Sequence, residues 1–352
     1  MYSSEKLMNF RWISKIVATY APYTLSSKDL ASPQVQEYLS EIGQFTEIAY
    51  VHGAIPTKFI FDNLETLLEP TFPLDGYHAV RDAQLVTSFI GKTANLPGIV
   101  AYRAQAKQLI LAISGTRSAL QALYDLYAIK HRHPSRRGRV HTGFWRLYKG
   151  IKSLALDGVR KGLAEHDVKE FVLSGHSMGA VVSQFLLLDI LRDETILPIN
   201  DIPIKFVGFG GPRSATKGLV SYWQELFDQR REKYGTDSIS EYSVKMYNDG
   251  VPSLPPLILG YRHYAQAPFY LVHGRLYQVP ADLCEYALFH VTSDADDEKP
   301  PAHPRGGHNY YNNRDMERFR RRNLWLDKAM KKGGDWKDLY GAKVAKHDRM
   351  AS

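Results

Sequence analysis

Uninterrupted apolar runs alternate with segments of helical periodicity through the middle of the chain. The runs "EFVLSG", "IKFVGFG" (Ile204–Gly210) and "YSVKMYN" (Tyr242–Asn248) predict buried strands. Met178–Arg192 and Lys217–Lys233, which lie between them, predict helices. Because apolar strands joined through helices favour a parallel sheet covered on both faces, we expect an α/β fold with a mostly parallel central sheet.

The flanking segments extend this pattern. A Ser-Pro opening followed by helical spacing predicts a helix over Pro33–Val51. Two β-rich runs, Gly98–Ala104 and Gln108–Ser114, predict strands joined by a short turn, and a long helix is expected over Gly143–Glu165. A polar stretch over Asp294–Gly307 precedes a final basic helix.

The length of 352 residues, with 44% hydrophobic and 23% charged residues, is typical of a globular protein with one large or two modest domains. No internal repeat or low-complexity tract divides the chain. We expect one domain, with a helical N-terminal region over residues 1–96, a catalytic core over 97–311, and a basic C-terminal helix and tail over 312–352.

The stretch "VLSGHSMGAVV" changes from a strand pattern to a helix pattern with no linker. A serine between two glycines at such a junction is typical of a nucleophile elbow, where the strand and the helix pass too close for larger side chains. Gly175 and Gly179 supply that clearance, and the helix start offers free backbone N–H groups. Ser177 is therefore the candidate nucleophile, whereas Ser174 lies in the strand end and is expected to be structural.

A serine nucleophile needs a base and an orienting carboxylate, and this architecture has the chain order serine, acid, histidine. Asp249 stands directly after an apolar strand and before a Pro-rich turn, which is the position expected of the acid. Asp201 precedes its strand, and Asp237 lies in a loop leading into one, so both fall at the other edge of the sheet.

Five histidines that follow the acid are candidates for the base. His308 lies in a loop after Gly-Gly and before the last helix, so it can reach the sheet edge, and His303 is its main competitor. The others are expected to pack or form hydrogen bonds: His263, His273 and His290.

An oxyanion needs two donors. The backbone N–H of Met178 is one, and the loop after "LILAIS" supplies the other through Thr116, with both its N–H and its hydroxyl. The alternative is that Ser-Gly-Thr forms only a turn.

Seven ordered motifs support this interpretation: "ISGT", "VHTGF", "GHSMG", "FGGPR", "YNDGVPSLPP", "GYRHY" and "GHNYY". With them, residues 97–311 resemble the filamentous-fungal triacylglycerol lipases, the class 3 lipases of the α/β-hydrolase fold. The resemblance implies the triad Ser177, Asp249 and His308, with Thr116 and Met178 at the oxyanion.

The resemblance also implies a lid directly after the oxyanion loop. "ALQALYDLYAI" has apolar and aromatic residues at helical spacing, Leu120, Leu123, Tyr124 and Tyr127, which predicts a short amphipathic lid helix. An ordinary helix packed on the core is the alternative. The chain departs from the family at Ser114, where arginine is common, and at Ala122, where tryptophan is common, but the predicted reaction stays the same.

The net charge of +8 is concentrated in "KHRHPSRRGR" and in the basic run near the C-terminus. The second run is explained by a solvated helix face, with attraction to an anionic membrane or lipid-droplet surface as the sharper interpretation. No nucleic-acid-binding motif accompanies the charge, so no nucleic-acid partner is expected.

The compartment is predicted from cysteine usage and hydropathy. Cys284 is the one cysteine, which excludes an intrachain disulfide and favours a reducing compartment. No run reaches signal-peptide length or the roughly 18 apolar residues of a membrane span. We expect a cytoplasmic protein with peripheral contact with lipid surfaces, provided that no leader has been removed.

These observations predict a serine hydrolase that cleaves carboxylic esters, acylglycerols foremost, through an acyl-enzyme. The alternatives are a feruloyl or short-chain carboxylesterase and, from another class, a catalytically silent lipid-binding protein of the same fold. No Cys/His cluster has metal-ligand spacing, so neither a metal nor an organic cofactor is expected.

Overall fold

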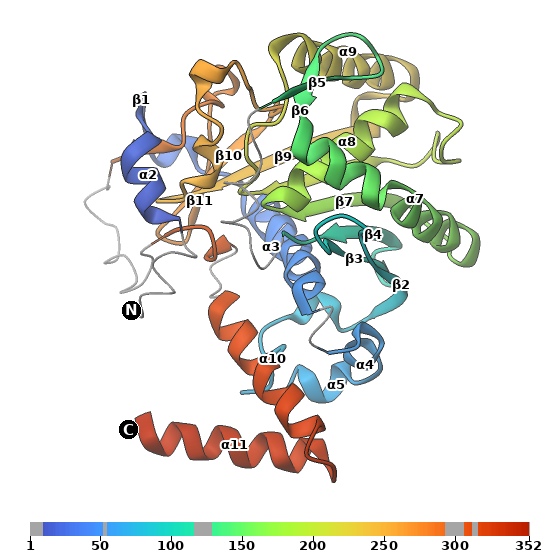
Figure 1. The fold of residues 1–352 in the computed structure, drawn as a ribbon, viewed down its shortest axis with the longest axis vertical. Coiled ribbons are helices and arrows are strands. Elements are labelled where there is room, and N and C mark those ends of the chain that lie inside the picture. The colour runs from blue at the N-terminus through green and yellow to red at the C-terminus, as the bar shows by residue number, and fades with distance from the viewer. Residues whose placement is uncertain (1–9, 52–54, 116–128, 293–305, 312–315, 352) are drawn as a thin grey trace.

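The centre of the protein is an eight-stranded sheet with the order β11-β10-β9-β8-β7-β4-β3-β2 (Figure 1). This computed structural model describes residues 10–51, 55–115, 129–292, 306–311 and 316–351. The strands of the sheet are β2 (Ala83–Ile90), β3 (Pro97–Arg103), β4 (Gln108–Ile113), β7 (Glu170–His176), β8 (Ile204–Phe209), β9 (Ile239–Met246), β10 (Pro268–Val272) and β11 (Arg275–Gln278).

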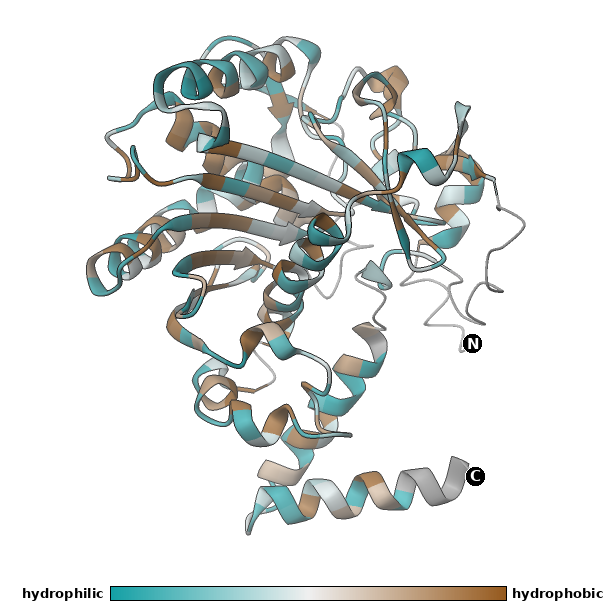
Figure 2. Cartoon of the chain, turned by 180° about the vertical axis from the view of Figure 1, so that it is seen from behind, coloured by the Kyte–Doolittle hydropathy of each residue, from teal (hydrophilic) through white to brown (hydrophobic). Residues whose placement is uncertain are grey.

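Neighbouring strands from β4 through β7, β8 and β9 to β10 pair in parallel, and antiparallel strands close both ends of the sheet. Every residue of β4 and β10 is buried, as expected of strands covered on both faces. Figure 2 shows that hydrophobic residues predominate along these central strands. The predicted mostly parallel α/β sheet is confirmed.

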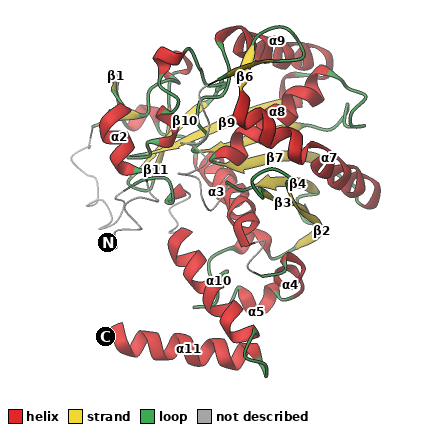
Figure 3. Ribbon diagram, viewed as in Figure 1, coloured by secondary structure: helices red, strands yellow, loops and turns green. Residues whose placement is uncertain are grey.

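Helices cover both faces of this sheet (Figure 3). The first face carries the helices of the alternating segment, which share one apolar core with it: α7 (Thr142–Glu165), α8 (Met178–Arg192) and α9 (Lys217–Tyr234). The second core includes residues of five further helices, two of them short: α3 (Pro33–Ile48), α4 (Thr57–Asp62), α5 (Leu64–Leu67), α10 (Met316–Met330) and α11 (Trp336–Ala351).

Smaller elements complete the described chain. Two short sheets pair β1 (Tyr20–Leu25) with β12 (Leu288–Val291), and β5 (Lys130–Arg132) with β6 (Arg139–His141). The helix α2 (Arg11–Val17) precedes β1. The 3₁₀ turns are η1 (Ser27–Asp29), η2 (Ala49–Val51), η3 (His78–Val80), η4 (Thr236–Ser238), η5 (Val251–Ser253), η6 (Leu257–Leu259) and η7 (Ala281–Leu283).

The expectation of a helical region over residues 1–96 omits two strands, β1 and β2. β2 is an edge strand whose pairing with β3 shifts register between Leu85 and Thr87, so its burial pattern is irregular and its sequence does not alternate cleanly. β1 pairs with β12 from the far end of the chain, and no local pattern can show such a partner.

The single basic helix expected after residue 312 is two helices, α10 and α11. Gly333 and Gly334 separate them, with φ of 72° and 84°. Glycine adopts these left-handed angles without strain and so ends the first helix. Figure 1 shows the pair extending away from the central sheet.

The predicted lid residues, Leu120, Leu123, Tyr124 and Tyr127, lie outside the described residues. Within the described segments, no helix has the length and hydropathy to cross a membrane.

Candidate active site

The turn from β7 into α8 holds Ser177 in a strained backbone conformation, with φ of 59° and ψ of −128°. On each side of this turn the backbone approaches another segment closely. A Cβ on Gly175 would lie 2.4 Å from the carbonyl carbon of Gly179, and a Cβ on Gly179 would lie 2.1 Å from the oxygen of Ile113. Only glycine fits at either position, so the sequence spacing around Ser177 follows from the packing of strand against helix.

Ser177 lies at the carboxyl edge of the parallel strands. Its backbone N–H donates to the carbonyl of Phe209 at the end of β8, at 2.8 Å. The side chain is 1% exposed, and its Oγ has no hydrogen-bond partner within the described chain. A buried hydroxyl without a partner is unusual in a folded protein, and it is available for chemistry.

His308 and Asp249 meet at the same edge. Nδ1 of His308 lies 2.9 Å from Oδ2 of Asp249, and both side chains are buried. Since a carboxylate only accepts, we assign Nδ1 as the donor, which leaves Nε2 as an acceptor. Nε2 has no partner among the described residues.

Asp249 is held by further donors. The hydroxyl of Tyr311 donates to its Oδ2 at 2.6 Å, and the N–H of Val251 donates to its Oδ1 at 2.9 Å. Burial, followed by the charge of Asp249, raises the pKa of Tyr311 well above its usual value, so this phenol keeps its proton. The carboxylate is therefore fixed in position by groups that do not titrate near neutrality.

The residue before the nucleophile links these parts. Nε2 of His176 lies 2.9 Å from the backbone oxygen of His308, and the two rings are 4.4 Å apart between centroids. His308 is thus packed against the elbow that carries Ser177.

The loop after β4 lies beside Ser177. A Cβ on Gly115 would come 3.0 Å from the Cβ of Ser177. Thr116, the next residue and a predicted oxyanion donor, lies outside the described residues. Met178, the other predicted donor, is the first residue of α8, where a helix has backbone N–H groups without intrahelical partners.

Tyr50, in η2 directly after α3, connects this loop to the elbow and was absent from the predicted site. The N–H of Gly115 donates to its hydroxyl at 2.8 Å, and that hydroxyl lies 2.6 Å from Nδ1 of His176. Burial lowers the pKa of His176 well below its usual value, so the ring is neutral. The only consistent proton assignment has Tyr50 donating to Nδ1 of His176, and Nε2–H of His176 donating to His308. No sequence motif marks Tyr50 for this position.

The helix α2 packs over the candidate acid and the candidate base. The ring of Phe10, just before α2, meets His308 edge-on at 5.1 Å between centroids, and Nε of Arg11 donates to the oxygen of Gly306 at 2.7 Å. A Cβ on Gly250 would lie 2.5 Å from the nitrogen of Ser14, so α2 also touches the loop that follows Asp249.

The remaining candidates lie elsewhere. Asp201 precedes β8 and Asp237 precedes β9, at the opposite strand ends. Nε2 of His263 pairs with the oxygen of Pro252, and His290 stacks on Tyr20. His273 lies in the β10–β11 turn, His303 falls outside the described residues, and Cys284 is a free, half-buried thiol.

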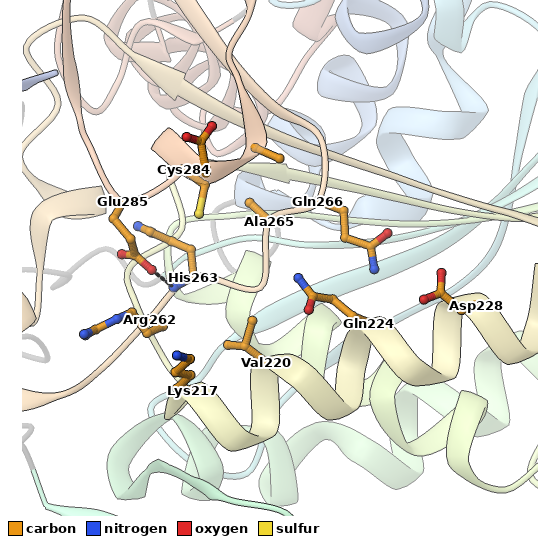
Figure 4. A pocket seen from close by; sticks show the side chains of 12 residues that line it. Lys217, Val220, Gln224, Asp228, Arg262, His263, Ala265, Gln266, Cys284 and Glu285 are labelled. Atoms are coloured by element: carbon orange, nitrogen blue, oxygen red, sulfur yellow. Dashed lines mark hydrogen bonds between the residues drawn. The ribbon is translucent and has the colours of Figure 1, made fainter. Parts of the chain in front are cut away.

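A cavity of about 620 Å³ lies between α9 and two loops, and none of the three candidate catalytic residues lines it (Figure 4). In the part of the chain that the structure describes, no cluster of three or more His, Cys, Asp or Glu residues could hold a metal ion.

The family model of the class 3 lipases matches residues 110–259. A lipase of Rhizopus niveus is 24% identical over 185 residues, which cover 52% of this chain and 44% of the relative. A secreted mono- and diacylglycerol lipase of Fusarium solani is 25% identical over 135 residues, 38% of this chain and 34% of the relative. The alignments thus span less than half the length of these curated relatives.

Solved structures extend the likeness. A Rhizomucor miehei lipase in complex with its propeptide has a TM-score of 0.57 at 19% identity and covers 71% of this chain and 72% of its own. Lipase II of Rhizopus niveus has a TM-score of 0.55 at 19% identity and covers 69% and 82%. A fungal lipase–inhibitor complex, solved as a model for interfacial activation, has a TM-score of 0.57 at 18% identity and covers 82% and 97%. At these identities the structures establish the fold, which is that of the α/β-hydrolases.

Proposed function

We propose that the chain is a serine hydrolase that cleaves acylglycerol esters, since its residues 110–259 match the family model of the class 3 lipases. The observation that carries the proposal is the unpartnered hydroxyl of Ser177 at a strained elbow, at the same sheet edge as a buried His308–Asp249 pair. Strain and an orphaned buried hydroxyl both cost stability, and catalysis is the function that such a serine serves in this fold.

In the proposed reaction, Nε2 of His308 removes the proton from Ser177 as its Oγ attacks the ester carbonyl. The imidazolium that forms is stabilised by Asp249, which Tyr311 and the N–H of Val251 hold in place. The alcohol leaves with the proton from His308, and an acyl group remains on Ser177. Water then attacks this acyl-enzyme with the same base and releases the acid.

The oxyanion is stabilised in this proposal by the N–H of Met178 at the start of α8 and by Thr116 after β4. The placement of Gly115 against Ser177 supports the second donor, because Thr116 directly follows Gly115 in the sequence. Losing one oxyanion donor typically costs about 3 kcal/mol of transition-state stabilisation.

The test is a fluorophosphonate probe followed by a substrate panel. We expect Ser177 to be labelled and Ser177→Ala to stay unlabelled. We expect hydrolysis of tri-, di- and monoacylglycerols above that of a phospholipid and a feruloyl ester. Absence of labelling in the native protein would support a lipid-binding protein, and activity limited to short or feruloyl esters would support an esterase.

A further inference from the structure

Three consecutive apolar residues stand exposed in η6, which we call the apolar knob: Leu257, Ile258 and Leu259. Their exposed fractions are 41%, 92% and 41%. Single exposed apolar residues are common, but a run of three on one turn marks a surface that meets another apolar phase. Ile129, after the predicted lid, is another exposed apolar residue, at 60%.

The apolar knob is held on a firm base. Nη1 of Arg262 donates to the oxygen of Leu257 at 3.3 Å. Beneath it, Arg213 is 4% exposed, donates through Nη1 to the oxygens of Ser253 and Pro255, and pairs with Glu285 at 2.6 Å. The structure thus presents the knob in a fixed conformation, and little ordering entropy remains to be lost on binding.

The surroundings of the apolar knob are cationic. Residues 129–141 and 250–267 contain no aspartate or glutamate. Lys130 lies 5.4 Å from the ring of Tyr261, and 3.1 Å from a Cβ on Gly260, so the β5–β6 hairpin touches the knob segment. A pair of β-bridges through Ala215 joins the two segments as well, one to Val140 and one to Arg262.

Three arginines of the hairpin are exposed and form no ion pair with another described residue: Arg132, Arg136 and Arg139. A fourth, Arg137, is paired with Glu225. Figure 4 shows Lys217, Arg262 and Glu285 at one end of the cavity beside α9, and Asp228 at the other end. Because Glu285 is paired with Arg213, the unpaired charge beside the apolar knob is that of the hairpin cations.

We propose that the apolar knob, flanked by the β5–β6 cations, docks the protein on an anionic lipid surface independently of the predicted lid. Apolar side chains inserted at the level of the headgroups, with lysine and arginine around them, are the combination that such a surface binds. The inference rests on the proposed function only in one respect: the lipid surface would carry the ester substrate of the proposed hydrolase. The knob follows Asp249 closely in sequence through η5, so docking there brings the candidate active site near the surface.

The experiment measures partition of the full chain, in the Ser177→Ala background, between buffer and phosphatidylcholine vesicles with or without phosphatidylserine. We expect binding to the anionic vesicles that weakens as salt is raised. Ile258→Glu should lower the partition coefficient at least about tenfold, from the loss of one buried apolar side chain. Each charge removed by Lys130→Gln, Arg132→Gln or Arg139→Gln should lower it about fivefold.

The matched control is Leu324→Glu, an equivalent change at an exposed leucine of α10, 49% exposed, which should leave the partition unchanged. Ile258→Val, which keeps an apolar side chain at this position, should bind the vesicles as the native residue does. Any of three results would overturn the proposal. Ile258→Glu could partition like the native protein, Leu324→Glu could lose as much vesicle binding, or the native protein could self-associate in a way that Ile258→Glu abolishes. Hydrolysis of a soluble short-chain ester by Ile258→Glu in the Ser177 background reports on the proposed function separately, and it should equal that of the native protein.

Discussion

Two buried aspartates, Asp249 and Asp189, have the same kind of neighbour and different remaining partners. Each accepts a hydrogen bond from a buried tyrosine, Tyr311 in the first case and Tyr148 in the second. Asp189, in α8, also pairs with Lys152 of α7 at 2.6 Å and with Arg192 at 3.1 Å. Asp249 instead pairs with His308.

The difference lies in the atoms that each partner leaves free. Lysine and arginine side chains only donate, so the cluster at Asp189 braces α7 against α8. His308 keeps an acceptor atom, Nε2, without a partner among the described residues, and its ring packs against the elbow that carries Ser177. An aspartate–tyrosine pair thus stabilises the packing of two helices at Asp189 and, in our proposal, takes part in catalysis at Asp249.

The largest expected effect separates the two aspartates by activity. Asp249→Asn should lower kcat/KM about 10⁴-fold, because an amide favours the wrong tautomer of His308. Asp189→Asn should leave kcat/KM unchanged, as measured on a soluble ester. A variant Asp249→Asn with more than about one hundredth of native activity would contradict the assignment of the acid.

A third buried carboxylate, Glu241 in β9, sharpens the comparison because its hydrogen bonds come from neutral groups: Trp223, Ser243 and the N–H of Gln266. Burial raises its pKa from 4.5 to about 7. A raised carboxyl pKa means that the folded state holds the proton more tightly, so stability falls as pH rises between these values.

The stability of native protein relative to Glu241→Gln should therefore fall by about 3 kcal/mol between about pH 4 and about pH 8. Urea unfolding at several pH values measures this difference. If the free energies of unfolding of the two proteins change with pH in parallel, the pKa of Glu241 is not raised in the folded state.

The brace predicts a stability effect of intermediate size. Asp189→Asn should lower the free energy of unfolding by about 2 kcal/mol, less than for a fully buried pair, because Lys152 and Arg192 are 34% and 29% exposed. Asp157→Asn is the control, since its pair with Arg160 is exposed and contributes at most about 0.5 kcal/mol. Equal effects of both variants in chemical denaturation would remove the distinction.

The smallest effect concerns Tyr50. Tyr50→Phe removes the acceptor of the Gly115 N–H and the donor to His176, so kcat should fall about tenfold with KM unchanged. Tyr148→Phe, the same chemical change at Asp189, should leave kcat unchanged and lower the unfolding free energy by about 1 kcal/mol. A fall in kcat no greater than that of Tyr148→Phe would reduce Tyr50 to a packing residue.

Local constraints explain which features of the fold and the candidate site could be predicted from the sequence. The elbow is visible in sequence because two glycines must stand at fixed offsets from Ser177 for strand and helix to approach. The long parallel strands are visible because burial on both faces makes their residues apolar in succession, as in β4 and β7. Asp249 could be proposed because an acid at the carboxyl edge must follow a strand end.

What the sequence did not reveal depends on residues that are distant along the chain. Tyr50 and His176 are 126 positions apart, and a tyrosine at a helix end carries no pattern that announces its partner. The pairing of β1 with β12 and the division of the C-terminal helix are similar cases, since the first needs tertiary contacts and the second depends on a glycine pair that also suits a loop.

The contact of α2 with the rim of the sheet has a consequence for proteolysis. Phe10 and the helix that follows it cover the imidazole at position 308 and the backbone after the acid. A protease that cut between α2 and β1 would leave every strand of the central sheet uncut and would remove the covalent tie that keeps this cover in place. In our proposal, hydrolysis would then decline before the sheet unfolds.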